Sequence, residues 1–508
     1  MEMNIKNGSL SVCSCVCRTK NSFTAECDVI VPDSKPDILK VLQLSAVPRY
    51  VNFETKNGRV SASGTVCFTI VYLADDEEKS MKSITSSCEF SNIIRDDAIS
   101  EFMLTFADVD VDEVNCNIVN CRKLTLKASL DMAVQVYTCF DLDLISEIEG
   151  ACTQKKNLTS SVICAHSQST TTLTDSFSLP NGKAPVCEIF RTDAVVTDSE
   201  IKVIDDKAVI KGNILITVLY RSEAGIEHIQ NEIPFAHILQ ADGIREEMDT
   251  EFCVKAMGPE ATVSENTDGE LCVIEFSADL YFRVLARCTY KAECVTDAFL
   301  PHGNLGCKYS PVCVDSIETI IHRDAEIREK ITLPEGYPPI AEVYQVILRP
   351  FIESCRSDGE VLKALGYADI YILYLSSEEN SPVCSYKETV EFAVSCESPG
   401  CSLTPISDCV LKNFSYTINS DNCVEVRGIV DIKIQCVRTT EEDIIYAAEE
   451  SEYIPQKRPS IIVSCVCNER SLWDIAKEYK ITPESILSAN ALENEDGITP
   501  HMALIIPK

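Results

Sequence analysis

The sequence predicts a mainly β protein of three tandem antiparallel repeats, each of about 150 residues and each a β-sandwich or barrel-like unit, followed by a small α+β domain of the order βααβ. Three observations predict this fold class. Two motifs recur three times at matching distances, and the segments around them alternate apolar with other residues, as half-buried strands do. Beyond residue 455 the apolar period changes from two residues to that of a helix, which indicates a separate domain.

The first motif is a strand-like segment in which a tyrosine follows a glycine by eight residues. It reads SGTVCFTIVYLAD from Ser63, KGNILITVLYRSE from Lys211 and LGYADIYILYLSS from Leu365. A proline-containing motif precedes each copy: VPDSKPDILKV from Val31, LPNGKAPVCEI from Leu179 and LPEGYPPIAEV from Leu333. Both motifs shift by 148 residues to the second copy and by a further 154 to the third. Because neither slips against the other, we infer one domain copied three times.

Two similar strand-like segments lie within the first repeat, which indicates a doubled β unit. The tyrosine-bearing segment of the first repeat is rich in β-branched and aromatic residues and alternates with period two, and a second such segment follows 64 residues later. The predicted inward faces are Val60, Ala62, Gly64, Val66, Phe68, Ile70 and Tyr72, and then Leu124, Leu126, Ala128, Leu130, Met132, Val134 and Val136. Turn signals such as Asn57-Gly58 separate the strands, which favours a sandwich or a partly open barrel.

These patterns also predict the domain boundaries. We expect a leader at 1–13, repeats at 14–158, 159–311 and 312–455, a linker at 456–460 and the C-terminal domain at 461–508. The linker lies within PQKRPS, a polar stretch bounded by prolines.

The charge balance disfavours some classes of partner. The formal net charge is −34, and lysine and arginine form no large cluster, so nucleic acid and anionic membrane are poor candidates. The N-terminal stretch does not have the pattern of a secretory signal, and no run of apolar residues is long enough to span a membrane. We therefore expect a cytoplasmic protein.

The 27 cysteines are expected to be reduced thiols that serve as small apolar residues in strands. An alternative is a metal or redox role for Cys13, Cys15 and Cys17, which a regular strand would place on one face.

The sequence contains no HExxH, GxSxG or GxxxxGK[ST] motif, and no repeat carries a distinctive polar cluster. We therefore expect no catalytic residue, no cofactor and no metal, and hence no enzyme.

The last fifty residues carry two short helices between strands. Ser471 and Asp474 form a capping box at the start of the first helix, and Thr482 followed by Pro483 begins the second. Residues 460–508, with SLWDIAKEYKITPESILSAN at the centre, resemble a LysM domain.

LysM domains typically bind N-acetylglucosamine between a Gly-Asp-Thr-Leu-Trp loop and a Pro-Gly-Gln loop. Here both loop glycines are replaced, by Glu469 and His501, and a β-carbon narrows the approach of a sugar to the backbone. We therefore expect a protein-binding surface instead, formed by Glu469, Arg470, Leu472, Trp473, His501 and Met502. Trp473 is the only tryptophan in the chain, and tryptophan and arginine are enriched at binding hot spots. Partial burial of Trp473 as a fold residue is the alternative, and both can hold.

The long repeats resemble the SPOCS domain of clostridial spore proteins. The residues that carry this resemblance are the segments from Leu179 to Pro185 and from Leu333 to Pro339, together with the Gly-to-Tyr strand, whereas the first copy departs from the pattern with VPDSKPD. The resemblance implies a mother-cell adaptor at the forespore surface, whose LysM domain binds the coat-basement ATPase SpoIVA. The repeats are expected either to contact further coat proteins or to extend the reach between binding sites. The alternative is a cell-wall protein that binds peptidoglycan.

Overall fold

The computed structural model of the chain describes residues 4–77, 79–378, 383–398, 400, 403–419, 422–452, 462–465, 471–494, 498 and 502–507. Eighteen long strands come first, six to each repeat. The first six are β1 (Ile5–Ile30), β2 (Ile38–Lys56), β3 (Arg59–Ala74), β4 (Met81–Arg95), β5 (Leu104–Asn120) and β6 (Lys123–Ile148). The next six are β7 (Cys152–Ser178), β8 (Val186–Ile204), β9 (Lys207–Ser222), β10 (Gly225–Gln240), β11 (Asp249–Glu265) and β12 (Leu271–Phe299). The third set is β13 (Asn304–Thr332), β14 (Ile340–Ser357), β15 (Val361–Ser376), β16 (Val383–Glu397), β17 (Thr404–Asn419) and β18 (Cys423–Ser451).

Each repeat is an antiparallel sandwich of two three-stranded sheets, which confirms the predicted fold class. In the first repeat the sheet orders are β1-β6-β5 and β2-β3-β4, and the other two repeats follow the same plan. The predicted inward faces meet in one core between the sheets, where Phe68 and Ile70 lie against the face that carries Leu124 and Leu130. Separate cores of the same kind fill the second and third repeats.

The glycine of the repeated motif has a packing cause. Gly64, Gly212 and Gly366 each lie opposite a phenylalanine of the neighbouring edge strand, and a β-carbon on any of them would meet that ring at 2.5–2.9 Å. The aromatic ring therefore lies over the glycine, an arrangement known to stabilise glycine in sheets.

The tyrosine of the motif ties the central strand to the proline-containing segment. The hydroxyl of Tyr72 donates to the carbonyl of Pro36 at 3.1 Å, and that of Tyr374 donates to the carbonyl of Pro338 at 2.9 Å. In the second repeat alanine occupies the corresponding position, 184, and Tyr220 donates to Glu227 at 3.1 Å instead. All three tyrosines are fully buried, so the hydrogen bonds satisfy hydroxyl groups that water does not reach.

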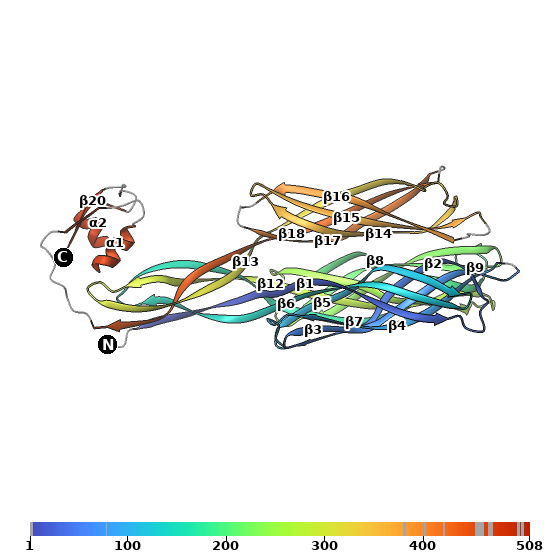
Figure 1. Cartoon of the computed structure of the whole chain (residues 1–508), viewed down its shortest axis with the longest axis horizontal. Helices are drawn as coiled ribbons and strands as arrows, with labels where there is room; N and C mark the ends of the chain where they lie inside the picture. Colours follow the sequence, from blue (N-terminus) through green and yellow to red (C-terminus); the bar gives the residue numbers. More distant parts are fainter. Residues whose placement is uncertain are drawn as a thin grey trace.

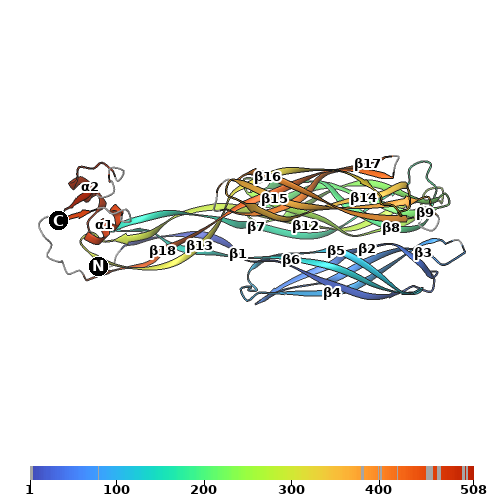
Figure 2. The same ribbon diagram turned by 45° about the horizontal axis from the view of Figure 1, so that its top comes forward.

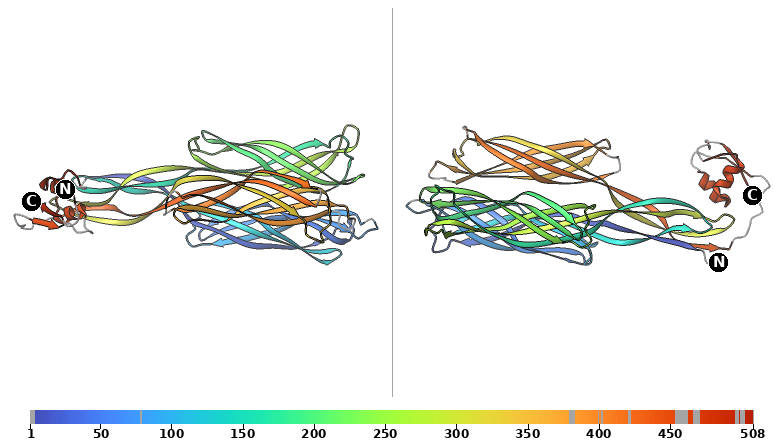
Figure 3. Two further views of the ribbon diagram at one scale, coloured as in Figure 1. Left: turned by 90° about the horizontal axis from the view of Figure 1, so that it is seen from above. Right: turned by 180° about the vertical axis from the view of Figure 1, so that it is seen from behind.

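The three sandwiches lie side by side around a common long axis (Figures 1, 2 and 3). An apolar cluster joins them, in which Val71, Leu219 and Leu373 are equivalent residues of the three repeats. The outer ends of the longest strands continue beyond the sandwiches and twist together into what we call the stalk. Two apolar clusters fill the stalk: Leu10, Val12, Leu144, Leu158, Cys294, Val314 and Ile444, and then Ile145, Ile148, Val295, Ala298, Ile445 and Ala448.

The domain boundaries remain a prediction, and the strands divide the chain as follows. The six-stranded units run over 5–148, 152–299 and 304–451, so the first strand starts within the stretch 1–13 that we expected to precede the repeats. The chain passes from one unit to the next at the far end of the stalk, around residues 149–151 and 300–303.

The C-terminal domain has the predicted βααβ order. It consists of β19 (Ile462–Cys465), α1 (Leu472–Tyr479), α2 (Pro483–Ala489) and β20 (Ala503–Ile506), with β19 and β20 paired antiparallel. Ser471 caps α1 in the predicted capping box with Asp474, and Thr482 caps α2. The domain lies beside the tip of the stalk (Figure 1).

Candidate functional site

Trp473 lies in the first turn of α1, where the capping box fixes the start of the helix. Of the six residues predicted to bind a partner, Leu472 is buried in the core of the domain, and Trp473 and Met502 are half-buried against that core. Leu472 therefore does not form part of the surface, and its contribution is to hold Trp473 in place. Glu469, Arg470 and His501 lie outside the described residues. The whole set remains a prediction.

The indole of Trp473 contacts the tip of the stalk. Its Nε1–H donates to Oδ2 of Asp297, near the end of β12, at 2.7 Å. Lys477, one turn further along α1, places its Nζ 2.6 and 2.8 Å from the two oxygens of the same carboxylate. Tyr309 of β13 donates to Asp297 at 2.9 Å. Asp297 thus accepts from three side chains, and we call these four residues together with Phe299 the docking site.

These donors stabilise the negative charge of Asp297. Burial raises the pKa of Asp297, but the hydrogen bonds from Lys477, Trp473 and Tyr309 favour the carboxylate and bring its pKa below the ordinary value. The group is therefore an anion at neutral pH, and charge-assisted hydrogen bonds of this kind are stronger than neutral ones.

An apolar contact accompanies the polar one. The ring of Phe299 meets the indole of Trp473 edge to face, with 5.0 Å between centroids. Phe299 is 5% exposed and belongs to the same apolar cluster as Leu472 and Ile475 of the C-terminal domain. The core of the small domain therefore extends into the second repeat.

A second pair of hydrogen bonds fixes the end of α1 on the stalk. The backbone N–H of His302 donates to the carbonyl of Lys480 at 2.9 Å, and Nζ of Lys480 donates to Asn304 at 3.2 Å. Lys480 ends α1 in the left-handed conformation, which directs its carbonyl away from the helix. The small domain is thus held at both ends of its first helix.

The sequence reasoning missed Asp297 and Phe299, although a signal for them exists. Ile145, Val295 and Ile445 are equivalent residues of the stalk core, which aligns the three strand ends. On that alignment the first repeat has Glu147 and Glu149 where the second has Asp297 and Phe299, and the third repeat has Ala447 and Glu449. An aromatic residue at this position in one copy alone indicates a contact that the other copies do not make.

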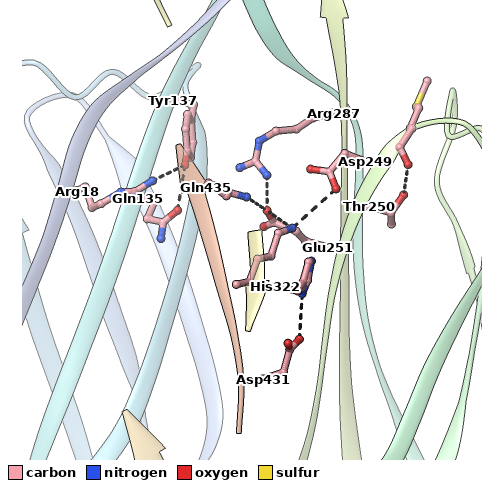
Figure 4. Close-up of polar contacts among 12 residues, drawn as sticks. Arg18, Gln135, Tyr137, Asp249, Thr250, Glu251, Arg287, His322, Asp431 and Gln435 are labelled. Atoms are coloured by element: carbon pink, nitrogen blue, oxygen red, sulfur yellow. Dashed lines mark hydrogen bonds and ion pairs between the residues drawn. The ribbon is translucent and has the colours of Figure 1, made fainter. Parts of the chain in front are cut away.

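A shielded cluster of charges lies elsewhere, between the second and third repeats (Figure 4). Glu251 of β11 accepts from Arg287 of β12 at 2.7 Å and from Lys433 of β18 at 3.1 Å, and it also contacts Gln435. Burial raises the pKa of Glu251, but Arg287 and Lys433 lower it below the ordinary value. The carboxylate is thus neutralised by residues of two repeats, and the cluster serves as a tie between them.

Neighbouring polar pairs in the same view are local. Arg18 donates to the hydroxyl of Tyr137 at 3.1 Å, and Nδ1 of His322 lies 3.1 Å from Asp431 (Figure 4). Asp431 has equivalents in Asp131 and Asp279, and each of the three aspartates has a hydroxyl, lysine, arginine or histidine partner. They act as polar ties on the outer faces of the sheets.

The geometry does not support the metal alternative for Cys13, Cys15 and Cys17, and the redox alternative stays a prediction. A bulge between Cys15 and Cys17 interrupts the alternation of β1, and Cys15 is exposed whereas Cys13 and Cys17 are buried. Within the described ranges, no group of three or more His, Cys, Asp or Glu side chains is arranged to hold a metal ion. In that same part of the chain, no helix has the length and apolar character to cross a bilayer.

The fold and the docking site together define a β-repeat protein with a small C-terminal binding module. Comparison with protein families specifies the modules: residues 37–119 and 185–257 match the family described as SipL, SPOCS domain, and residues 471–507 match the LysM domain. The chain is thus similar to SipL proteins, with SPOCS segments and a C-terminal LysM domain, which relates it to sporulation and spore coat assembly. Both domain types are of the non-catalytic, binding kind. The comparisons with curated proteins and with solved structures found no match.

Proposed function

We propose that this chain is a non-enzymatic adaptor of sporulation, whose LysM domain binds a coat-basement ATPase of the SpoIVA type. On this proposal the protein acts in the mother cell and carries its repeats to the surface of the forespore. A module that is docked there raises the effective concentration of everything joined to it, so the repeats can gather further coat proteins without high affinity of their own.

One observation carries the proposal. The face of the LysM domain around Trp473 contacts protein groups, namely the carboxylate of Asp297 and the ring of Phe299. An indole with a cationic neighbour such as Lys477 suits a protein surface, because it supplies apolar area, a hydrogen-bond donor and a charge together. The replacement of both loop glycines in the sugar-binding pattern also favours a protein ligand over a sugar.

The test is retention of a purified SpoIVA-type ATPase by the immobilised full-length chain. We expect retention that is lost when Trp473 is replaced by glutamate. Absence of retention by the folded wild-type chain would contradict the proposal. A fluorescently tagged copy followed during spore formation should encircle the forespore.

Binding of peptidoglycan is the second candidate, favoured by the match of residues 471–507 to the LysM domain. Sedimentation of the full-length chain with purified cell wall separates the two candidates. We expect the chain to stay in the supernatant, and co-sedimentation that N-acetylglucosamine oligomers prevent would favour the cell-wall function.

A further inference from the structure

The second repeat contributes a short extended segment to the docking site. Asp297 and Phe299 are two residues apart at the end of β12, where they pair with Gln154 and Cys152 of β7. Alternate residues of a strand share a face, so both side chains reach the same neighbour, the first turn of α1. The segment therefore resembles a bound peptide in which an acidic residue is followed, two positions later, by an aromatic one.

The LysM side of the contact is matched to that pattern. Nε1 of Trp473 and Nζ of Lys477 converge on the carboxylate of Asp297, while the indole ring packs on Phe299. An aspartate without a following aromatic residue would satisfy the donors and leave the indole face uncovered. Both halves of the pattern are thus needed to cover the Trp473 face.

The contact is specific to one of three nearly equivalent strand ends. The corresponding residues are Glu147 and Glu149 in the first repeat, and the third repeat has no acidic residue at the first position, which is Ala447. The tips of all three repeats meet in the stalk, and only the second carries an acidic residue followed two positions later by an aromatic one.

We infer that the face of the LysM domain formed by Trp473 and Lys477 recognises an extended Asp-x-Phe segment, that Asp297 and Phe299 are its resident ligand, and that a protein partner presenting the same pattern must displace them. The inference that a partner is involved rests on the proposed function. The recognition of the resident segment does not.

The sole tryptophan of the chain allows a direct test in the full-length protein. Asp297→Asn combined with Phe299→Leu should shift the Trp473 emission to longer wavelength and increase its quenching by acrylamide. The matched control is Glu147→Gln with Glu149→Gln, which changes the equivalent positions of the first repeat and should leave the emission as in the wild type. Lys477→Met, which alters only the LysM side, should give a smaller shift in the same direction.

A peptide supplies the second arm. The hexapeptide Val-Thr-Asp-Ala-Phe-Leu, which copies residues 295–300, should bind the opened double variant and reverse its emission shift, whereas the same peptide with alanine at the Asp and Phe positions should not. In the wild type the peptide can bind only those molecules in which Asp297 and Phe299 have left the LysM face. Its affinity should therefore be lower by the inverse of that fraction, about tenfold if one molecule in ten is in this open state.

Each outcome decides one point. Unchanged Trp473 emission in both the double variant and Lys477→Met, with the circular dichroism of the wild type, would overturn the intrachain contact. A peptide that fails to bind the opened chain would overturn the Asp-x-Phe recognition. In a separate measurement the SpoIVA-type ATPase should be retained more strongly by the double variant than by the wild type. If the peptide binds and no variant retains the ATPase, the proposed function fails and the recognition stands.

Discussion

The indole N–H of Trp473 donates to the carboxylate of Asp297 across 2.7 Å, although the two residues are 176 positions apart in the chain. Together with the ion pair of Lys477 and the packing of Phe299, this hydrogen bond joins the C-terminal domain to the second of three repeats. It also places the only tryptophan of the protein at the contact, so the state of the contact can be read from its fluorescence.

Acidification should release the LysM domain from the stalk. Lys477, Trp473 and Tyr309 hold the pKa of Asp297 below its ordinary value in the docked state, against the opposing effect of burial. A carboxylate with a lowered pKa stabilises the docked state above its pKa in the undocked chain, about 3.9, and this contribution is lost as the pH falls through the docked value. The Trp473 emission should therefore shift to longer wavelength below about pH 4. The Asp297→Asn variant lacks the titrating group, and the same acid transition in that variant would assign the change to another residue.

Trp473→Glu should abolish both the intrachain contact and the binding of a SpoIVA-type ATPase. The change removes the indole that packs on Phe299 and places a second carboxylate beside Asp297, where like charges repel. Because the indole is half-buried and the core residues Leu472 and Ile475 remain, we expect the domain to fold. Circular dichroism checks the fold, and retention of the ATPase checks the binding. A folded variant that retains the ATPase as the wild type does would show that Trp473 is not part of the partner surface.

Gly366→Ala should destabilise the third repeat by about 1–3 kcal/mol. A β-carbon at this position would lie 2.5 Å from the ring of Phe392 and 2.6 Å from the carbonyl oxygen of Phe351, and a backbone atom cannot move aside cheaply. Urea unfolding measures the change. Gly8→Ala is the matched control, because a β-carbon there meets nothing within 4 Å and alanine suits a strand better than glycine. Equal losses in the two variants would mean that the ring of Phe392 does not explain the glycine.

Local pattern and repetition made most of the fold predictable. Period-two alternation gave the buried faces of β3 and β6, and capping residues gave the start of both helices. The sequence could not reveal that Tyr220 would bond to Glu227, because the donor group is the same in all three copies and only the acceptor differs.

The docking site was harder to predict because it depends on tertiary structure. Asp297 lies in a strand whose alternation resembles that of its neighbours, and its role depends on a helix that follows in the chain only after the whole third repeat. The LysM pattern covers only the C-terminal domain, so it carries no information on the residues of the repeats that contact this domain. A comparison of the three strand ends would have singled out Phe299, since the other two copies have glutamate there.

Glu251→Gln should weaken the junction of the second and third repeats. The carboxylate lies 2.7 Å from Arg287 and 3.1 Å from Lys433, and the side chain of Arg287 is only 11% exposed. A neutral amide removes the counter-charge of Arg287 and leaves Lys433 with Asp249 alone, 3.8 Å away. Such a loss at a shielded site costs about 1–3 kcal/mol. The acidic form of Glu251 should have the same effect in the wild type, so the stability that depends on Glu251 should fall as the pH drops through its lowered pKa.

The measurement is the midpoint of urea unfolding at neutral pH. Both fluorescence and circular dichroism are used to detect unfolding, because a chain of several units need not unfold in one step. Glu293→Gln is the control: it breaks the exposed pair with Lys155, 2.9 Å apart, and changes of that kind stay within about 0.5 kcal/mol. If Glu251→Gln and Glu293→Gln shift the midpoint equally, the charges around Glu251 add no more than a surface pair does. The junction would then depend on the apolar clusters that the two repeats share.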